Sequence, residues 1–142
     1  MSTLRNHWLI AATVGLMAVG GCATTGSNLS SSANRLERNA IALHDESREG
    51  DVRSAFRTDA RELAEEARDF RRTVEDRDSS KEDVREAFSD VSKRYHAMRD
   101  EVERSQSRPA EREFRPVTEA YLDVEREMRS RDDRRDRYAR DE

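Results

Sequence analysis

Two histidines, His44 and His96, are the first residues to test for chemistry, because helical proteins often use imidazole to bind metal ions. Di-iron bundles place a Glu three residues before a ligand His, one helical turn away. Here Ile41 and Lys93 occupy those positions. Each His also stands beside an apolar stripe rather than on it. We therefore expect both to be solvated flanking residues, and we assign no metal ligand.

Met98 and Met128 could serve as axial haem ligands together with a histidine. Both methionines belong to apolar stripes, where this flexible side chain commonly fills a core. The sequence also has no Cys-x-x-Cys-His attachment motif. A haem or metal protein is therefore only a third alternative, and we expect no cofactor bound by side chains.

Patterns of catalytic residues are missing from the sequence. It has no Gly-x-Ser-x-Gly turn, and after the single cysteine, Cys22, its only glycines are Gly26 and Gly50, too few for a phosphate-binding loop. Acidic residues are abundant, but acid–base catalysis needs a buried carboxylate, and none occupies an apolar stripe. We assign no catalytic residue and expect a protein that is not an enzyme.

Cys22 follows a segment typical of secretory signals. Residues 1–7 are polar with one positive side chain, Arg5, and residues 8–19 are apolar apart from Thr13. A helix of that apolar length would span about 18 Å, well short of the roughly 30 Å hydrocarbon core of a bilayer. We interpret it as a signal peptide rather than a membrane span.

The four residues Val19-Gly20-Gly21-Cys22 resemble the lipobox of bacterial lipoproteins, which has an aliphatic residue, two small residues and an obligatory Cys. The resemblance implies cleavage between Gly21 and Cys22, a diacylglyceryl thioether on Cys22 and acylation of its amine. Several acyl chains anchor a protein stably, whereas one does so marginally. An ordinary secretory signal is the alternative, but an orphan thiol in a secreted chain argues against it.

The residue after the lipobox bears on location. In lipoproteins of this kind an Asp next to the lipidated Cys favours retention at the inner membrane, and here the residue is Ala23. The resemblance implies an outer-membrane anchor facing the periplasm, with the periplasmic face of the inner membrane as the alternative. The Ser- and Thr-rich residues that follow predict a flexible tether.

Charge excludes one class of partner. Charged residues make up 41% of the chain and its net charge is −4. Both signs alternate after Cys22, so no single-sign field would attract nucleic acid. The expected partners are the lipid bilayer, through Cys22, and either envelope proteins or a second copy of the chain.

Apolar residues recur at alternating steps of three and four, the spacing of helical bundles and coiled coils rather than of strands. We therefore expect an all-α fold, a small antiparallel bundle of three to four coiled-coil-like helices, or a hairpin that dimerises. The core is thin, which suggests modest stability or a partner. The stripes are Leu36, Ala40, Leu43; Phe56, Ala60, Leu63, Ala67, Phe70, Val74; Val84, Phe88, Val91, Tyr95, Met98, Val102; and Phe114, Val117, Tyr121, Val124, Met128.

Capping signals predict where the helices begin. Asn34 with Glu37 resembles a capping box for the first helix, and Ser79 with Glu82 resembles one for the third. Pro116 lies within the last stripe, so the last helix either starts or kinks there. Gly50 predicts the end of the first helix. Asp51 predicts the cap of a second helix that begins at residue 52. Helices two and three should be about 25 residues each, with shorter helices flanking them.

These signals divide the chain into four parts. They are a cleaved signal peptide (1–21), the lipidated Cys with a flexible tether (22–33), a helical bundle (34–130) and a charged tail expected to be disordered (131–142). The expected function is a non-catalytic structural or protein-interaction module. The alternative is a chaperone-like or small-ligand- or metal-binding bundle, in which part of the aromatic set forms an exposed groove.

Overall fold

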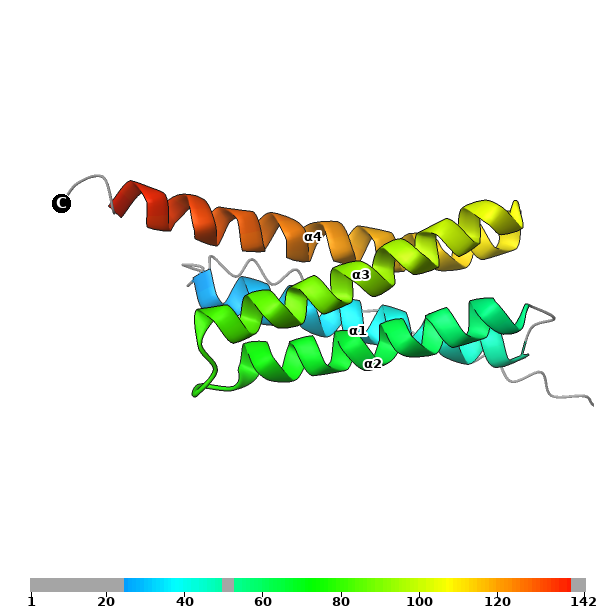
Figure 1. The fold of residues 1–142 in the computed structure, drawn as a ribbon, viewed down its shortest axis with the longest axis horizontal. Coiled ribbons are helices and arrows are strands. Elements are labelled where there is room, and N and C mark those ends of the chain that lie inside the picture. Colours follow the sequence, from blue (N-terminus) through cyan, green and yellow to red (C-terminus); the bar gives the residue numbers. More distant parts are fainter. Residues whose placement is uncertain (1–24, 50–52, 139–142) are drawn as a thin grey trace, which may run out of the picture.

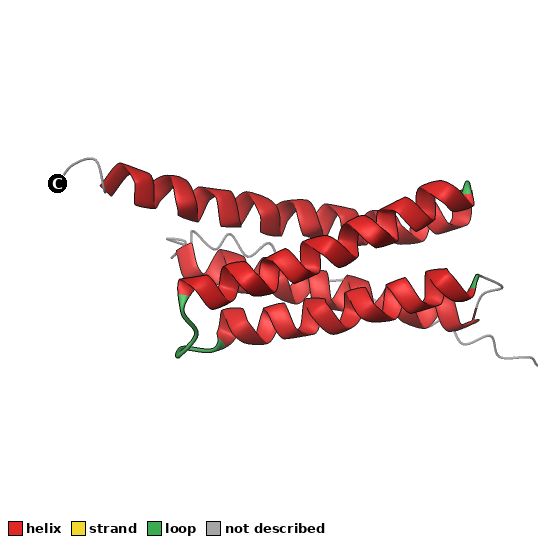
Figure 2. Cartoon of the chain, in the orientation of Figure 1, coloured by secondary structure: helices red, strands yellow, loops and turns green. Residues whose placement is uncertain are grey.

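The structure, a computed structural model, describes residues 25–49 and 53–138 as four helices joined by short turns (Figures 1 and 2). No strand occurs within these residues, so the expected all-α bundle is confirmed, with four helices rather than three. The helices are α1 (Thr25–Glu49), α2 (Ser54–Glu75), α3 (Lys81–Ser105) and α4 (Arg108–Tyr138).

Successive helices run antiparallel and close into a ring. α1 packs against α2 and α4, and α3 packs against α2 and α4, while the backbones of helices on opposite corners do not come close. The start of α1, the turn from α2 to α3 and the end of α4 share one end of the bundle (Figure 1). We call this the N-terminal end. The last turns of α4 project beyond the other helices there.

The core consists of the predicted stripes. Every stripe residue is buried except Val74, Val84 and Phe88, which are partly buried and pack against the core. Met98 and Met128 are buried core residues, as their stripe positions predict. A period near 3.5 residues keeps one face of each helix turned toward its neighbours, so the stripes become a continuous interior.

Two of the four pairs of neighbouring helices, α1–α2 and α3–α4, approach each other to different extents. Both α1 and α2 carry buried alanines, Ala33 and Ala40 on α1 and Ala60, Ala64 and Ala67 on α2. Small side chains allow helix axes to approach closely. The backbones of α3 and α4 come close over a shorter stretch than those of any other neighbouring pair, and aromatic rings fill the space between them.

The predicted start of the first helix is wrong. α1 begins at Thr25 rather than Asn34, so most of the expected flexible tether is helical, and residues 22–24 lie outside the described residues. Leu29 and Ala33 have no exposed surface and extend the stripe by two steps. Serine is only a moderately poor helix former, and burial of Leu29 outweighs that preference. Asn34, the predicted cap, lies inside α1.

Capping at the other starts also differs from the prediction. The capping box of α3 uses Ser80 and Asp83, one residue later than predicted: Asp83 N–H donates to Ser80 Oγ (3.1 Å) and Ser80 N–H donates to Asp83 Oδ2 (2.7 Å). α2 begins at Ser54, and its N-cap, Arg53, makes no side-chain cap. The predicted signals Gly50 and Asp51 lie outside the described residues.

α4 is longer than expected at both ends. It begins at Arg108, so Pro116 lies inside the helix and does not start it. Proline is tolerated in a first turn, where Pro109 stands, whereas Pro116 removes one backbone hydrogen bond. The Asn39 side-chain amide of α1 donates to the Pro116 carbonyl (2.8 Å). α4 also continues to Tyr138, so the tail expected to be disordered from residue 131 is helical to that point, and α1 and α4 are not the short helices.

Candidate functional site

The lipobox residues Gly21 and Cys22 lie outside the described residues, but their distance from the bundle is limited by the chain. α1 starts at Thr25, and three residues can span at most about 11 Å. A group attached to Cys22 is therefore held next to the N-terminal end of the bundle. None of the described helices is both long enough and apolar enough to cross a membrane.

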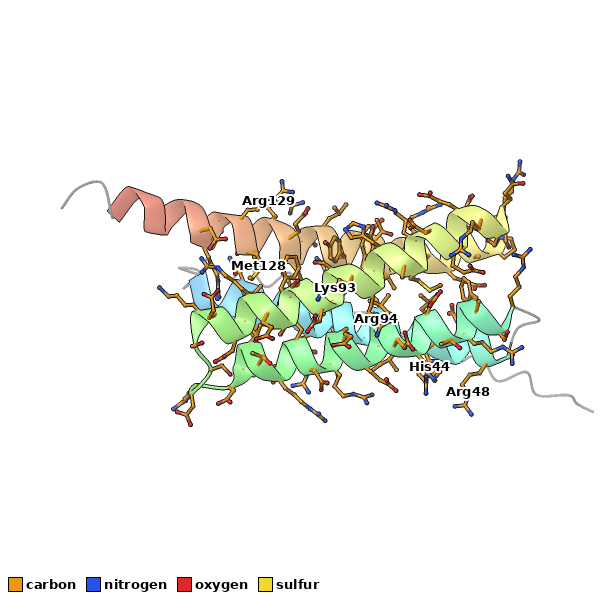
Figure 3. All side chains as sticks on the ribbon, in the orientation of Figure 1. His44, Arg48, Lys93, Arg94, Met128 and Arg129 are labelled. Carbon is orange, nitrogen blue, oxygen red and sulfur yellow. The ribbon has the colours of Figure 1, made fainter. Side chains whose placement is uncertain are left out.

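The two histidines lie in different places and do not approach each other. His96 is exposed on α3, with its ring edge-on to Tyr95 (centroids 5.3 Å apart) and Tyr121 (6.0 Å). His44 is half-buried, so only His96 matches the predicted solvated position. Figure 3 shows His44 and Met128 toward opposite ends of the molecule. Among the described residues, no three or more His, Cys, Asp or Glu side chains are grouped to hold a metal ion.

Acidic and basic side chains connect the helices across all four interfaces. Each neighbouring pair of helices shares at least one ion pair, as expected where flanking charges specify which helices pair and in what orientation. The pairs are Glu37–Arg71 and Glu37–Arg68 (3.5 Å) for α1–α2, Glu62–Arg94 (2.6 Å) for α2–α3, Arg85–Asp132 (2.5 Å) for α3–α4, and Arg35–Asp123 for α1–α4.

One buried acid was missed by the sequence analysis. Glu101 of α3 is 2% exposed and its carboxylate pairs with Arg104 at 2.9 Å. Burial, followed by the negative charges of Glu101 and Glu62, raises the pKa of Asp59 on α2. The signal was present in the sequence, since Glu101 follows Met98 by three residues and so shares the buried face of α3 with Val102.

The aromatic stripe residues form a closed cluster rather than an open groove. Phe56, Phe70, Tyr95, Phe114 and Tyr121 are buried, and Phe88 is partly buried against them. Their rings form an unbroken series of contacts from Phe70 through Phe88 and Tyr121 to Tyr95 and Phe114, with centroids between 3.9 and 5.9 Å apart. These rings therefore belong to the core.

Two depressions of the described surface lie where α1 and α4 meet. One depression, of about 390 Å³, lies between Asn39 and Leu43 of α1 and Pro109 and Pro116 of α4. It is toward the end of the bundle opposite the N-terminal end, which we call the far end. A second, of about 260 Å³, is lined by Asn28, Ser31, Ser32, Arg35, Arg38 and Glu127. The second has polar side chains throughout and lies toward the N-terminal end of the bundle. We call it the polar groove.

The polar groove is built by one face of α1. Asn28, Ser31, Arg35 and Arg38 follow each other at steps of three, four and three, so they form a single row along the helix. Glu127 supplies the opposite wall from α4. This row was not predicted from the sequence, because residues 22–33 were expected to form a tether and only apolar stripes indicated helices.

Comparisons with known proteins found no matching family model, no similar curated protein and no similar solved structure. A functional proposal for this chain therefore depends on its own residues and geometry.

Proposed function

We propose that this chain is an outer-membrane-anchored lipoprotein facing the periplasm, and that its helical bundle is a non-catalytic structural or protein-interaction module. One observation carries the proposal: the lipobox-like residues 19–22 are followed almost directly by a helix, α1, which starts at Thr25. A diacylglyceryl thioether and an acylated amine on Cys22 would supply the several chains that stable anchoring needs.

The short connection supports a positioned module rather than a loosely tethered one. Leu29 is fully buried, so the chain enters the core seven residues after Cys22. A bundle attached this way would stand with its N-terminal end, including the end of α4, close to the bilayer surface. Partners in the envelope would then meet the far end of the bundle and the sides that do not face the bilayer.

The distribution of side chains favours an interaction module over a chaperone-like one. A protein that holds unfolded chains needs exposed apolar surface. Among the described residues, Leu122 is the one large apolar side chain that is exposed. The helix surfaces instead carry charges of both signs, which suit specific polar contacts with a folded partner.

The anchor is tested by metabolic labelling with a radioactive fatty acid in cells that express the full-length chain. We expect label on the wild type and none on Cys22→Ala, with unchanged labelling of the matched control Ser27→Ala. Equal labelling and equal membrane association of the Cys22→Ala variant would contradict the proposal.

Location and partners need two further measurements. Density-gradient separation of the membranes should place the wild type in the outer membrane and move an Ala23→Asp variant toward the inner membrane. Crosslinking of the lipidated protein in its own envelope should recover a defined protein partner or a second copy. Recovery of many unfolded client chains would instead support the chaperone-like alternative.

A further inference from the structure

We propose that the polar groove binds the phosphoethanolamine headgroup of a membrane phospholipid, with Arg38 binding the phosphate and Glu127 the ammonium. The supply of this ligand rests on the proposed membrane anchoring, since the groove must face a bilayer to meet it. Three properties of the groove support this assignment: which of its side chains are already engaged, their charges, and its position in the bundle.

Arg35, one of the two arginines of the groove, is already paired. It forms an ion pair with Asp123 of α4, and Asp123 also accepts a hydrogen bond from Arg126 at 2.8 Å. The charge of Arg35 is therefore used to join α1 to α4. Its role in the groove is to hold the wall in place.

The remaining polar groups of the groove are unengaged within the described part of the chain. Asn28, Ser32 and Arg38 make no side-chain hydrogen bond or ion pair there, and neither does the carboxylate of Glu127. Arg38 is exposed and Glu127 is half-buried. The groove thus presents one available cation, one available carboxylate and several neutral hydrogen-bond donors.

This combination matches a ligand that carries both charges. A guanidinium can donate two parallel hydrogen bonds to a phosphate, and hydroxyl and amide groups such as those of Ser32 and Asn28 add neutral donors. The Glu127 carboxylate accepts hydrogen bonds from an ammonium group. A purely anionic ligand would be repelled by Glu127, whereas phosphoethanolamine complements both groups.

Size and position agree with this ligand. The groove of about 260 Å³ has several times the volume of one water, which is about 30 Å³. Asn28, at its near edge, lies three residues into α1, about 5 Å along the helix axis. Arg38 lies thirteen residues into α1, about 20 Å along its axis, and Cys22 can be at most about 11 Å from its start. The groove therefore meets lipid headgroups when the α1–α4 side of the bundle lies against the bilayer.

The test is a titration followed by backbone amide NMR, using the full-length protein in a non-ionic detergent. The ligands are glycerophosphoethanolamine, glycerophosphocholine (whose quaternary nitrogen has no N–H) and inorganic phosphate. The variants are Arg38→Gln and Glu127→Gln. Arg48→Gln is the matched control, because Arg48 is exposed on the same helix but toward its opposite end (Figure 3).

We expect saturable shifts in residues 28–38 and around Glu127 with glycerophosphoethanolamine. Arg38→Gln should weaken binding at least tenfold, and Glu127→Gln should remove the preference over glycerophosphocholine and over phosphate. Arg48→Gln should change neither. Since Arg38 is exposed, helical circular dichroism should be the same in every variant.

Three results would overturn the inference. They are no saturable shift at the groove, equal binding of inorganic phosphate by the wild type, or equal weakening by Arg38→Gln and Arg48→Gln. The titration does not depend on acylation. Headgroup binding by an unlabelled protein would therefore contradict the proposed anchor alone, whereas a labelled protein without headgroup binding would contradict this inference alone.

Discussion

Tyr95 of α3 and Tyr121 of α4 stack face to face, with ring centroids 3.9 Å apart and an angle of 7° between the ring planes. The Tyr121 hydroxyl donates a hydrogen bond to Ser92 Oγ at 3.0 Å, and Ser92 in turn donates to the Phe88 carbonyl. This pair joins the two helices whose backbones are in contact over the shortest stretch. The α3–α4 interface therefore depends on side chains more than the α1–α2 interface does, where the two backbones approach each other more extensively.

Truncation of this ring is expected to be costly. Tyr121→Ala should lower the free energy of unfolding by about 3–5 kcal/mol, the range for removing a buried aromatic ring. Tyr121→Phe keeps the stacking and loses the hydrogen bond to Ser92, so it should cost about 1 kcal/mol. Urea unfolding followed by circular dichroism measures both. Leu122→Ala is the control, because Leu122 is 46% exposed, and an equally large loss there would contradict the assignment.

The charge of Asp59 is expected to make stability depend on pH. Burial first, then Glu101 and Glu62, raises its pKa above the ordinary value of 3.8. The folded protein therefore binds the carboxyl proton of Asp59 more tightly than the unfolded chain does. The resulting stabilisation is fully present below about pH 3.8 and is lost as the pH rises through the folded-state pKa.

Replacement of the Asp59 carboxyl by an amide should therefore stabilise the folded protein near neutral pH only. Asp59→Asn is expected to raise the free energy of unfolding by about 0.5 kcal/mol at pH 7, the size typical of a partly exposed charge interaction. At pH 3 the gain should disappear. Thermal unfolding at both pH values measures it, with the exposed Glu65→Gln of the same helix as control. An equal gain at pH 3 and pH 7 would rule out this explanation.

The start of α3 distinguishes two adjacent serines. Ser80→Ala should cost about 1 kcal/mol, because it removes the acceptor for the Asp83 N–H. Ser79→Ala should stay within about 0.5 kcal/mol, as for other substitutions away from such features. Chemical unfolding of the two variants compares them directly. If Ser79→Ala were the more damaging change, the capping box would start at the residue that the sequence pattern suggested.

The ion pair between Glu62 and Arg94 is expected to show energetic coupling across the α2–α3 interface. Glu62→Arg and Arg94→Glu should each destabilise the bundle, and the double exchange should recover about 0.5–1 kcal/mol. Asp69 and Arg72, an exposed pair within α2, provide the comparison. A double-mutant cycle by urea unfolding gives the coupling energy. Additive effects of the two exchanges would contradict a specific contact between these helices.

The polar row on α1 shows why part of the candidate site could not be predicted. Asn28, Ser31 and Ser32 belong to a Ser-rich stretch whose composition favours a tether. Their helical state depends on Leu29, which becomes apolar core only when the other helices cover it. Glu127, on the opposite wall, is almost a hundred residues away in the chain. Only packing of α4 beside α1 brings it to the groove.

The sequence by itself determined that the chain forms helices with one apolar face each, because steps of three and four residues turn those side chains to the same side. It also determined the lipobox-like motif at residues 19–22. The tertiary structure decided that α1 extends back to Thr25, that Ser80 rather than Ser79 caps α3, and that Glu101 is buried. These features depend on which surfaces the neighbouring helices cover. For Glu101, the spacing from Met98 places the side chain on the buried face of α3, but only packing decides that this face is covered there.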